Sequence, residues 1–459
     1  MNLKKDTNWM HFTGIAGVTL APLAIELKKL GYKVTGTDEN LYDPIKGIVE
    51  GSTIDVFEKF SYENLTRNGN IPNLLVTGAG VSEKNKELLF AKKQGITVKH
   101  FAEVLEELLI ENNSIVIAGT YAKTTITAML VAVLKEAEVE TSYMFGGVPV
   151  DGSSSIHLKT NKTLLSVVEG DEYIASRWDL KSKFYFYHPK YLILTVVKWD
   201  HTDVFTSEKD YIENFRNLVK QVPEDGAIFA NFADKNVVEV IESARCKVFK
   251  YKPDDVNKWA DENKITVSVL GSFNETNAAV AAKFAVEVLN LDIVDVQVAL
   301  KNFEGIKRRL EVRYASPGKK LHEARTIVLD DFASSTAKVQ GAIRAIKDEF
   351  PKHQLVVVYE PNTGNRTKRA VEEFVEVFQG AEIVFLPKFK ELIKSRKTKF
   401  LNENEFGDFL KEKVNVEVQG SDSELVDKIL KRSRNTKTVI AFMSSQGMSD
   451  RIQLLLSKL

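Results

Sequence analysis

The sequence predicts an α/β fold built from three successive segments. Short apolar runs alternate with helical stretches of amphipathic spacing along the whole chain, and this alternation is typical of parallel sheets covered by helices. The length of 459 residues accommodates about three domains of ~150 residues each. We therefore expect an N-terminal domain over residues 1–109, a central domain over 110–312 and a C-terminal domain over 313–459.

In the first segment, an apolar strand that begins at Trp9 leads through a glycine turn into a helix and then a second strand. This order is one βαβ unit. The same alternation continues to about residue 110. The expected helices cover residues 18–31, 84–94 and 102–112, and the later expected strands cover 32–39, 73–80 and 96–101.

The central segment restarts the pattern with a buried strand, a turn and a long helix over residues 114–137. A mixed-charge stretch over 303–325 separates it from a third alternating segment. Further strands of the central segment are expected at 163–170, 191–197 and 226–231, and a helix at 271–290. Those of the third segment are expected at 326–332, 354–361, 382–387 and 438–443.

The composition argues against several classes of protein. Sixty-three basic and 63 acidic residues give a formal net charge of +0, so no global positive field favours nucleic acid or an anionic membrane surface. Cys246 is the single cysteine, which excludes an internal disulfide and a cysteine zinc site and favours a reducing compartment. No signal-type leader and no apolar run of ~18 residues stands in the sequence. We expect a cytoplasmic protein without membrane insertion.

The strongest local signal for chemistry lies between an apolar strand and a helix. Backbone N–H groups at such a helix start bind phosphate oxygens, a lysine neutralises the β- and γ-phosphates, and the next hydroxyl ligates Mg²⁺. Lys123 and Thr124 fit these two roles, and an ordinary helix cap is the alternative. The candidate ATP-binding residues here are Gly119, Thr120, Lys123, Thr124 and Thr125.

A second glycine turn follows the first strand of the chain. Alone it is a weak signal, because the G-x-G-x-x-G spacing of dinucleotide sites is not met and glycines there also permit close helix packing. Asp38 ends the second strand nearby, where an acidic residue can bind a ribose. The turn consists of Gly14, Ile15, Ala16 and Gly17.

Acidic and histidine side chains follow two strands of the central segment. Glu169 ends one strand and His201 follows another, and the carboxyl ends of parallel strands share one edge of a sheet. Beside Thr124, a carboxylate and an imidazole could hold Mg²⁺ or accept Mn²⁺. The alternatives are an ordinary surface carboxylate and a hydrogen-bonded histidine.

The order of these motifs resembles the Mur ligase family, the ATP-dependent amide ligases of peptidoglycan synthesis. The match spans nearly the whole chain. The segment 119–125 is similar to the family's G-T-x-G-K-T-T loop, Glu169-Gly-Asp-Glu172 to its E-A-D-E stretch, and Asp200-His201 to its D-H pair. Further on, Gly271-Ser-Phe-Asn274, Ile306-Lys-Arg-Arg309 and Asp330-Asp331-Phe332-Ala333 resemble its adenine-side, hinge and third-domain motifs.

The resemblance implies a three-domain architecture: a Rossmann-like domain that binds a UDP-sugar through the glycine turn and Asp38, a central P-loop ATPase-like domain, and a Rossmann-like ligase domain. It implies catalytic roles for Lys123, Glu169 and His201, with Thr124, Glu169 and His201 as metal ligands. Asn274, Arg309 and Asp331 are expected to position ATP.

The early glycine motif and Phe145-Gly-Gly-Val-Pro149 resemble the branch that acts on UDP-N-acetylmuramate. The amine substrate implied first is the tripeptide L-Ala-γ-D-Glu-meso-diaminopimelate, because Asp179-x-x-Ser182-Lys183-Phe184 resembles the recycling members. Members that add L-alanine are the alternative. The resemblance implies an acyl-phosphate intermediate, and it leaves monomer and homodimer open.

Several positions depart from the family pattern. Ala122 replaces the glycine before the P-loop lysine, and its methyl would crowd a turn that needs positive φ. Phe273 replaces the histidine of the adenine motif, and Ser334 and Ser335 replace two histidines, so neutral hydroxyls stand where imidazolium could pair with phosphate. A catalytically weakened nucleotide-binding homologue is therefore a second alternative. An NAD-dependent oxidoreductase using the glycine turn is a third, although it leaves the P-loop unexplained.

Overall fold

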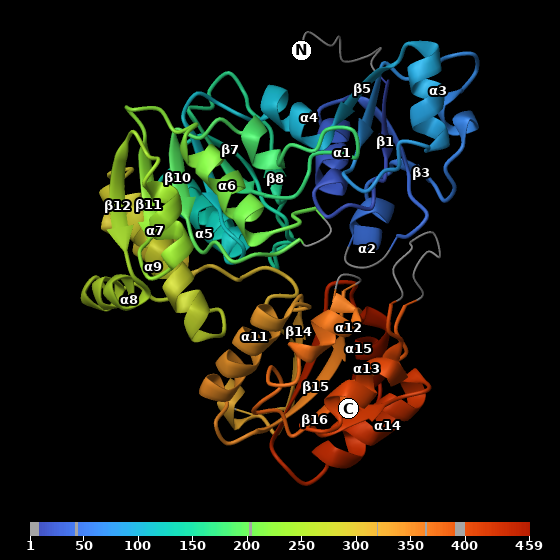
Figure 1. Ribbon diagram of the computed structural model, residues 1–459, viewed down its shortest axis with the longest axis vertical. Helices are drawn as coiled ribbons and strands as arrows, with labels where there is room; N and C mark the ends of the chain where they lie inside the picture. The colour runs from blue at the N-terminus through green and yellow to red at the C-terminus, as the bar shows by residue number, and fades with distance from the viewer. Residues whose placement is uncertain (1–8, 42–44, 202–203, 319, 363–364, 391–399) are drawn as a thin grey trace. The chain divides into compact units, whose positions relative to one another are not determined.

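The described chain forms three α/β parts, each built on its own sheet (Figure 1). The computed structural model describes residues 9–41, 45–201, 204–318, 320–362, 365–390 and 400–459. Within these ranges no helix is long and apolar enough to cross a bilayer. The α/β class expected from the alternating pattern is confirmed.

The first sheet has five parallel strands in the order β3-β2-β1-β4-β5. The first strand is central, as in doubly wound folds, so that its end and the end of β2 lie next to each other at one edge. The strands are β1 (Trp9–Thr13), β2 (Lys33–Thr37), β3 (Asp55–Phe57), β4 (Leu74–Thr77) and β5 (Thr97–His100). The helices are α1 (Leu20–Lys29), α2 (Ile45–Glu50), η2 (Tyr62–Leu65), α3 (Lys86–Gln94) and α4 (Phe101–Leu108).

The second sheet has seven strands in the order β12-β11-β10-β6-β9-β7-β8, and only β8 runs antiparallel to its neighbour. Its central strand β6 is buried along its whole length and carries the P-loop segment. The strands are β6 (Ser114–Ala118), β7 (Thr141–Met144), β8 (Ile156–His157), β9 (Leu165–Gly170), β10 (Tyr191–Leu194), β11 (Ala227–Asn231) and β12 (Lys247–Tyr251).

The long helix after β6 starts at the lysine of the P-loop segment, and five further α-helices and one 3₁₀ helix follow in this part of the described chain. Some of these helices begin with a side-chain cap; for example, the Ser207 hydroxyl at the start of α6 accepts the Asp210 N–H. The helices are α5 (Lys123–Glu136), η3 (Lys183–Phe186), α6 (Glu208–Val219), α7 (Lys235–Ile241), α8 (Pro253–Glu262), α9 (Ser272–Glu287) and α10 (Ile293–Lys301).

The third sheet has six strands in the order β13-β14-β18-β15-β16-β17, parallel except for the edge strand β13. The strands are β13 (Glu311–Ala315), β14 (Thr326–Asp331), β15 (Gln354–Glu360), β16 (Ile383–Leu386), β17 (Val416–Val418) and β18 (Thr438–Ser444). The helices are η4 (Leu321–Glu323), α11 (Thr336–Glu349), α12 (Lys368–Glu372), α13 (Glu403–Leu410), α14 (Asp422–Ser433) and α15 (Ser449–Leu456).

Two compact units contain these three sheets. The first and second sheets belong to one unit over residues 1–268 and 276–304, and the third sheet belongs to a unit over 269–275 and 305–459. Within the first unit, apolar side chains of both sheets form a continuous core, in which Phe12 of β1, Leu105 of α4 and Phe215 of α6 are buried. The domain limits at 109 and 312 stay predictions.

All the strands expected from apolar runs are present, most of them shorter than the runs themselves. The strands that were missed lie at edges or are short, such as β3, β8 and β17. The antiparallel strand β13 lies inside the mixed-charge stretch that we expected only to separate two segments. Edge strands have one solvated side, which weakens their apolar pattern.

Helix α3 shows how local sequence fixes the elements near the glycine turn. The Asn85 side chain accepts hydrogen bonds from the N–H groups of Glu87 and Leu88 at the start of the helix, as N-cap residues do. At its end, Gly95 adopts φ of 70° in the left-handed region, which terminates the helix. Local sequence thereby defines both ends of α3.

We predict that Gly36→Ala destabilises the first sheet by about 1–3 kcal/mol. A Cβ at Gly36 in β2 would lie 2.5 Å from Cδ1 and 2.9 Å from Cβ of Ile15, so the glycine turn would have to move. Thermal unfolding followed by circular dichroism measures the effect. Gly80→Ala is the matched control, because a Cβ there meets nothing within 4 Å. Equal stability of the two variants would contradict this packing argument.

Candidate active site

The turn between β6 and α5 has the backbone of a phosphate-binding loop. Gly119 adopts φ of 133°, and a Cβ there would lie 2.1 Å from the Thr195 Oγ1 atom. No residue larger than glycine fits that position. The Thr120 N–H donates to the Val196 carbonyl at 2.7 Å, which fixes the loop against the neighbouring strand β10.

Ala122 has the left-handed conformation that its position in the loop demands. Its φ is 71° directly before α5, the region in which a Cβ costs roughly 1–2 kcal/mol. The Ala122 methyl group, which we expected to crowd this turn, is therefore tolerated at a cost in backbone strain. The loop keeps its shape in spite of the missing glycine.

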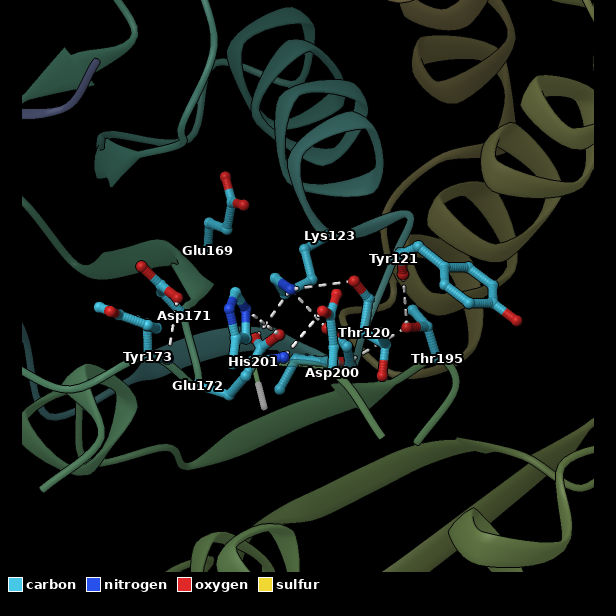
Figure 2. A network of polar contacts seen from close by, with 12 residues as sticks. Thr120, Tyr121, Lys123, Glu169, Asp171, Glu172, Tyr173, Thr195, Asp200 and His201 are labelled. Atoms are coloured by element: carbon cyan, nitrogen blue, oxygen red, sulfur yellow. Dashed lines mark hydrogen bonds and ion pairs between the residues drawn. The ribbon is translucent and has the colours of Figure 1, made fainter. Parts of the chain in front are cut away.

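The side chain of Lys123 is folded back onto its own loop (Figure 2). Its Nζ donates to the Gly119 carbonyl at 2.6 Å and forms an ion pair with Glu172 Oε2 at 2.8 Å. Burial by itself lowers the pKa of the Lys123 ammonium, but the charge of Glu172 and two further carboxylates outweighs burial and raises that pKa above its ordinary value. The lysine is therefore a fixed positive charge at the start of α5.

Glu172 joins three side chains of the site. Only 1% of its side chain is exposed, and its second oxygen, Oε1, lies 3.3 Å from His201 Nε2 and accepts the Tyr211 hydroxyl at 3.2 Å. Burial raises the pKa of Glu172, but the charge of Lys123 and the hydrogen bond from His201 hold it below its ordinary value. Glu172 is thus an ionised carboxylate that orients a lysine and a histidine together.

His201 is held in an unusual backbone conformation. Its φ is 53°, and strain of this kind is concentrated at functional sites. The imidazole meets the Tyr173 ring edge-on at 5.0 Å between centroids. Burial lowers the pKa of His201, but the hydrogen bond and charge of Glu172 raise it above the ordinary value. The ring is oriented from two sides.

The side-chain oxygens of Thr124 and Glu169 form a second pair, separate from the cluster around Glu172. The Thr124 hydroxyl donates to Glu169 Oε1 at 2.8 Å, and the Gly146 N–H donates to Oε2 at 2.5 Å. Figure 2 shows the Glu169 carboxylate turned away from the cluster of Lys123, Glu172 and His201. In the described ranges no three His, Cys, Asp or Glu side chains gather as metal ligands. The hydroxyl and carboxylate pair does fit a hard cation that phosphate oxygens also coordinate.

A buried tyrosine connects the loop to Glu172. The Thr120 Oγ1 and Tyr211 OH atoms lie 3.0 Å apart, and Thr120 Oγ1 also donates to the Lys198 carbonyl at 2.8 Å. The Tyr211 hydroxyl donates its one proton to Glu172, so this side chain lies between the loop, which it contacts at Thr120, and the carboxylate to which it is hydrogen-bonded. Thr125, in the first turn of α5, is buried.

The structure brings the residues of the N-terminal glycine turn together at the ends of β1 and β2. Gly14, with φ of 84°, and Ile15 both donate their N–H groups to the Thr37 carbonyl. Asp38 Oδ2 accepts the Ala16 N–H at 2.9 Å, and burial raises the pKa of Asp38. Asp38 therefore holds the shape of the turn.

Asn274, Arg309 and Asp331 lie in the second compact unit. Asn274 and Asp331 are buried and hold backbone: Asn274 Nδ2 donates to the Leu270 carbonyl, and the Asp331 carboxylate accepts the Leu310 and Ala333 N–H groups at 2.7 Å each. Arg309 lies over the Phe332 ring at 5.0 Å. Their expected contact with ATP stays a prediction.

The positions that depart from the family pattern differ in exposure. Phe273 is 37% exposed at the start of α9, and Ser335 precedes α11 as its N-cap residue. Ser334 is buried, and its carbonyl accepts hydrogen bonds from Tyr359 and Asn365. Its backbone is thereby fixed although the imidazole is absent.

The sequence did not identify three residues that the structure places in the site. Glu172 lies in the acidic stretch 169–172, for which the motifs predicted a role only for Glu169, and Tyr211 belongs to none of the motifs. Asp171, next to Glu172, pairs with Lys183 at 2.5 Å, and the charges of Lys183 and Lys123 outweigh burial to lower its pKa. The spacing of acidic residues after β9 was the only available signal.

Two family models match the chain over most of its first 285 residues. The model of the Mur ligase family catalytic domain matches residues 10–112, and the model of the Mur ligase middle domain matches residues 117–285. The chain belongs to the Mur ligase family. The P-loop lysine, Glu169 and His201 all lie within the middle-domain match.

Similar proteins agree with this assignment. The UDP-N-acetylmuramate--L-alanine ligase of Lactobacillus delbrueckii subsp. bulgaricus is 29% identical over 401 residues, which are 83% of this chain and 84% of the relative. Both chains are thus matched over most of their length.

Solved structures support the three-domain Mur ligase fold. The UDP-N-acetylmuramate-alanine ligase of Thermotoga maritima superposes with a TM-score of 0.73 at 19% identity, covering 98% of each chain. A second structure is the UDP-N-acetylmuramate:L-alanyl-gamma-D-glutamyl-meso-diaminopimelate ligase of Neisseria meningitides. It gives a TM-score of 0.57 at 25% identity, covering 66% of this chain and 99% of that one.

We predict that Ala122→Gly stabilises this Mur ligase by about 0.5–1 kcal/mol. Glycine relieves the left-handed strain of the folded state, and its greater flexibility in the unfolded state offsets only part of that gain. Thermal unfolding measures the shift. Ala132→Gly, inside α5, is the control and should destabilise the protein by about 1 kcal/mol. A lower melting temperature for Ala122→Gly would show that the loop is not strained at this position.

Proposed function

We propose that the protein is an ATP-dependent amide ligase that joins the carboxylate of UDP-N-acetylmuramate to the amine of L-alanine. The ligase class follows from membership of the Mur family. The observation that carries the proposal is the lysine at the start of α5, held with Glu172 and His201 at one edge of the central sheet. A fixed ammonium at a helix N-terminus is suited to a triphosphate.

The first chemical step transfers the γ-phosphoryl group. A lactyl carboxylate oxygen of UDP-N-acetylmuramate attacks γ-phosphorus, the bond to the β,γ-bridging oxygen breaks, and ADP leaves as an acyl phosphate forms. Negative charge moves onto the bridging oxygen during this step. Lys123 would stabilise that charge once its ammonium leaves the Gly119 carbonyl for the phosphates.

The second step forms the amide. The amine nitrogen attacks the acyl carbon and loses a proton to solvent, and inorganic phosphate departs from the tetrahedral intermediate as the carbon–oxygen bond to it breaks. His201 Nε2 lies 3.3 Å from Glu172 Oε1, so this carboxylate orients the imidazole beside the P-loop. The Glu172 carboxylate keeps it in that orientation.

We propose Thr124 and Glu169 as the protein ligands of Mg²⁺, with Mn²⁺ as an alternative and His201 as a further ligand. When bound, the ion would neutralise phosphate charge and polarise phosphorus–oxygen bonds. The support is the 2.8 Å separation of the two oxygens beside the P-loop. His201 is directed at Glu172, which makes it the weaker candidate of the three.

L-Alanine is favoured over the tripeptide as the amine substrate. The motifs indicated the tripeptide first, but similar proteins are named as L-alanine ligases, among them one from Lactobacillus acidophilus that matches 95% of this chain at 27% identity. The tripeptide stays a second candidate because the Neisseria structure named for it is 25% identical. These two amines differ in size and charge, so a direct assay separates them.

We predict that phosphate release from ATP requires both UDP-N-acetylmuramate and an amine, and that L-alanine gives the highest kcat/KM. The assay is a coupled phosphate-release measurement with L-alanine, L-serine, glycine and L-Ala-γ-D-Glu-meso-diaminopimelate as the amine. Mass spectrometry of the UDP-linked product confirms which amide formed. Removal of divalent ions with EDTA should abolish release, and added Mg²⁺ should restore it.

Three results would each exclude part of the proposal. Release that needs no UDP-sugar would contradict the ligase reaction. A preference for the tripeptide would reverse the order of the two candidate amines and leave the ligase class intact. Nucleotide binding without any release, over the whole amine panel, would favour the nucleotide-binding homologue without turnover that the departures from the family motifs allow.

A further inference from the structure

A second buried carboxylate lies in the first sheet, and the proposed reaction does not use it. Glu87, in the first turn of α3, has no exposed surface. Its Oε2 accepts the Thr13 hydroxyl at 2.8 Å and its Oε1 accepts the Thr37 hydroxyl at 2.6 Å. An ionised carboxylate with no solvent contact is costly to bury unless donors surround it.

The two threonines are the last residues of their strands. Thr13 ends β1 directly before Gly14, and Thr37 ends β2 directly before Asp38. The Thr37 carbonyl in turn accepts the Gly14 N–H at 2.8 Å. One carboxylate thus fixes both strand ends from which the glycine turn and its acidic partner extend.

Glu87 also fixes a third segment at the same edge of the sheet. Asn64, in the 3₁₀ helix η2, donates its side-chain amide to Glu87 Oε1 at 2.8 Å. The Ser61 N–H, at the start of η2, approaches the same oxygen at 3.4 Å. Because η2 follows β3, Glu87 joins the carboxyl ends of β1 and β2 to the segment that follows the neighbouring strand β3.

The imidazole of His11 completes the set of donors. Thr37 gives its hydroxyl proton to Glu87 at 2.6 Å, so its oxygen can only accept from His11 Nε2, which lies 3.2 Å away. His11 Nε2 therefore carries hydrogen, and it faces Glu87 Oε2 at 3.4 Å as well. On the other side of the ring, Nδ1 lies 2.8 Å from the Thr35 hydroxyl.

The protonation state of Glu87 agrees with this geometry. Burial raises its pKa, but the hydrogen bond and charge of His11, with further bonds from Thr37 and Asn64, outweigh burial and lower the pKa below its ordinary value. The carboxylate therefore accepts from every neighbour and donates to none. A fully satisfied buried network of this kind restricts the backbone to one arrangement.

We propose that Glu87 is a positioning residue for UDP-sugar binding: through the hydroxyls of Thr13 and Thr37 it holds the Gly14–Gly17 turn and Asp38 in the geometry that binds the nucleotide diphosphate. The inference rests on the proposed function and on the UDP-sugar role that the family resemblance implies for the glycine turn and Asp38. Glu87 itself is buried beneath the strand ends and acts only through the turn.

The test is Glu87→Gln, which keeps the shape of the side chain. Whichever way the new amide is turned, its NH₂ group opposes a hydroxyl or amide donor, so the network has to rearrange. We expect the Kd and KM for UDP-N-acetylmuramate to rise about tenfold or more, as for the loss of a charged hydrogen-bond acceptor. The KM for ATP and kcat at saturating UDP-sugar should change less than about twofold.

Two further variants separate the hydroxyl from the shape of Thr37. Thr37→Val removes the donor and keeps the volume, whereas Thr37→Ser keeps the donor and loses a methyl group. Thr37→Val should weaken UDP-N-acetylmuramate binding in the same direction as Glu87→Gln, and Thr37→Ser should bind within about twofold of the wild type. These variants keep the inference testable if Glu87→Gln does not fold.

Glu103→Gln is the matched control, the same chemical change in helix α4, which follows the last strand of the same sheet. Glu103 belongs to the capping box of α4 with His100. The Glu103→Gln substitution should therefore lower the stability of the protein without altering its affinity for the UDP-sugar. Isothermal titration with UDP-N-acetylmuramate and no ATP provides the readout, with thermal unfolding measured in parallel.

The outcomes distinguish this inference from the function on which it rests. If the wild type does not bind UDP-N-acetylmuramate, the proposed function fails. If the wild type binds it and Glu87→Gln binds equally well with a lower melting temperature, Glu87 is only structural and the positioning role alone is overturned. Equal weakening by Thr37→Val and Thr37→Ser would also contradict the role of the hydroxyl.

Discussion

The ion pair between Lys123 and the buried Glu172 is the interaction on which the candidate site depends. It holds the P-loop lysine against the Gly119 carbonyl and, through the other carboxylate oxygen, orients His201. A buried carboxylate with one partner removed would be left with an uncompensated charge. A triphosphate at the loop therefore competes with Glu172 for Lys123 and has to offer the ammonium at least as much negative charge. This competition favours a ligand with several phosphate oxygens over a ligand with one.

The sequence was most informative where a motif depends on neighbours along the chain. The strand, turn and helix around Lys123 were predicted because an apolar run, a glycine and a hydroxyl-rich helix start are all local features. The conflict at Ala122 was also visible in advance, since the turn needs positive φ and alanine disfavours it. Only the structure gives the outcome, in which the Ala122 backbone keeps the left-handed conformation with φ of 71°.

Roles that depend on distant partners could not be predicted in the same way. Glu169 and Glu172 stand three residues apart in one acidic stretch, yet the first pairs with Thr124 and the second with Lys123 and His201. Nothing in their spacing indicates which carboxylate faces the lysine. Asp38 is similar: an acidic residue after the second strand suggests ribose binding, but its carboxylate accepts the Ala16 N–H and so shapes the turn.

The most direct test of the claim that this loop binds the triphosphate is the ATP-dependent turnover of the Lys123→Ala variant. Phosphate release with ATP, UDP-N-acetylmuramate and the preferred amine should fall by about two orders of magnitude or more, because a fixed cation at the transferring phosphoryl group is lost. Lys135→Ala, an exposed lysine in the last turn of the same helix, should retain wild-type turnover. Full turnover by Lys123→Ala would contradict the assignment of this loop to the triphosphate.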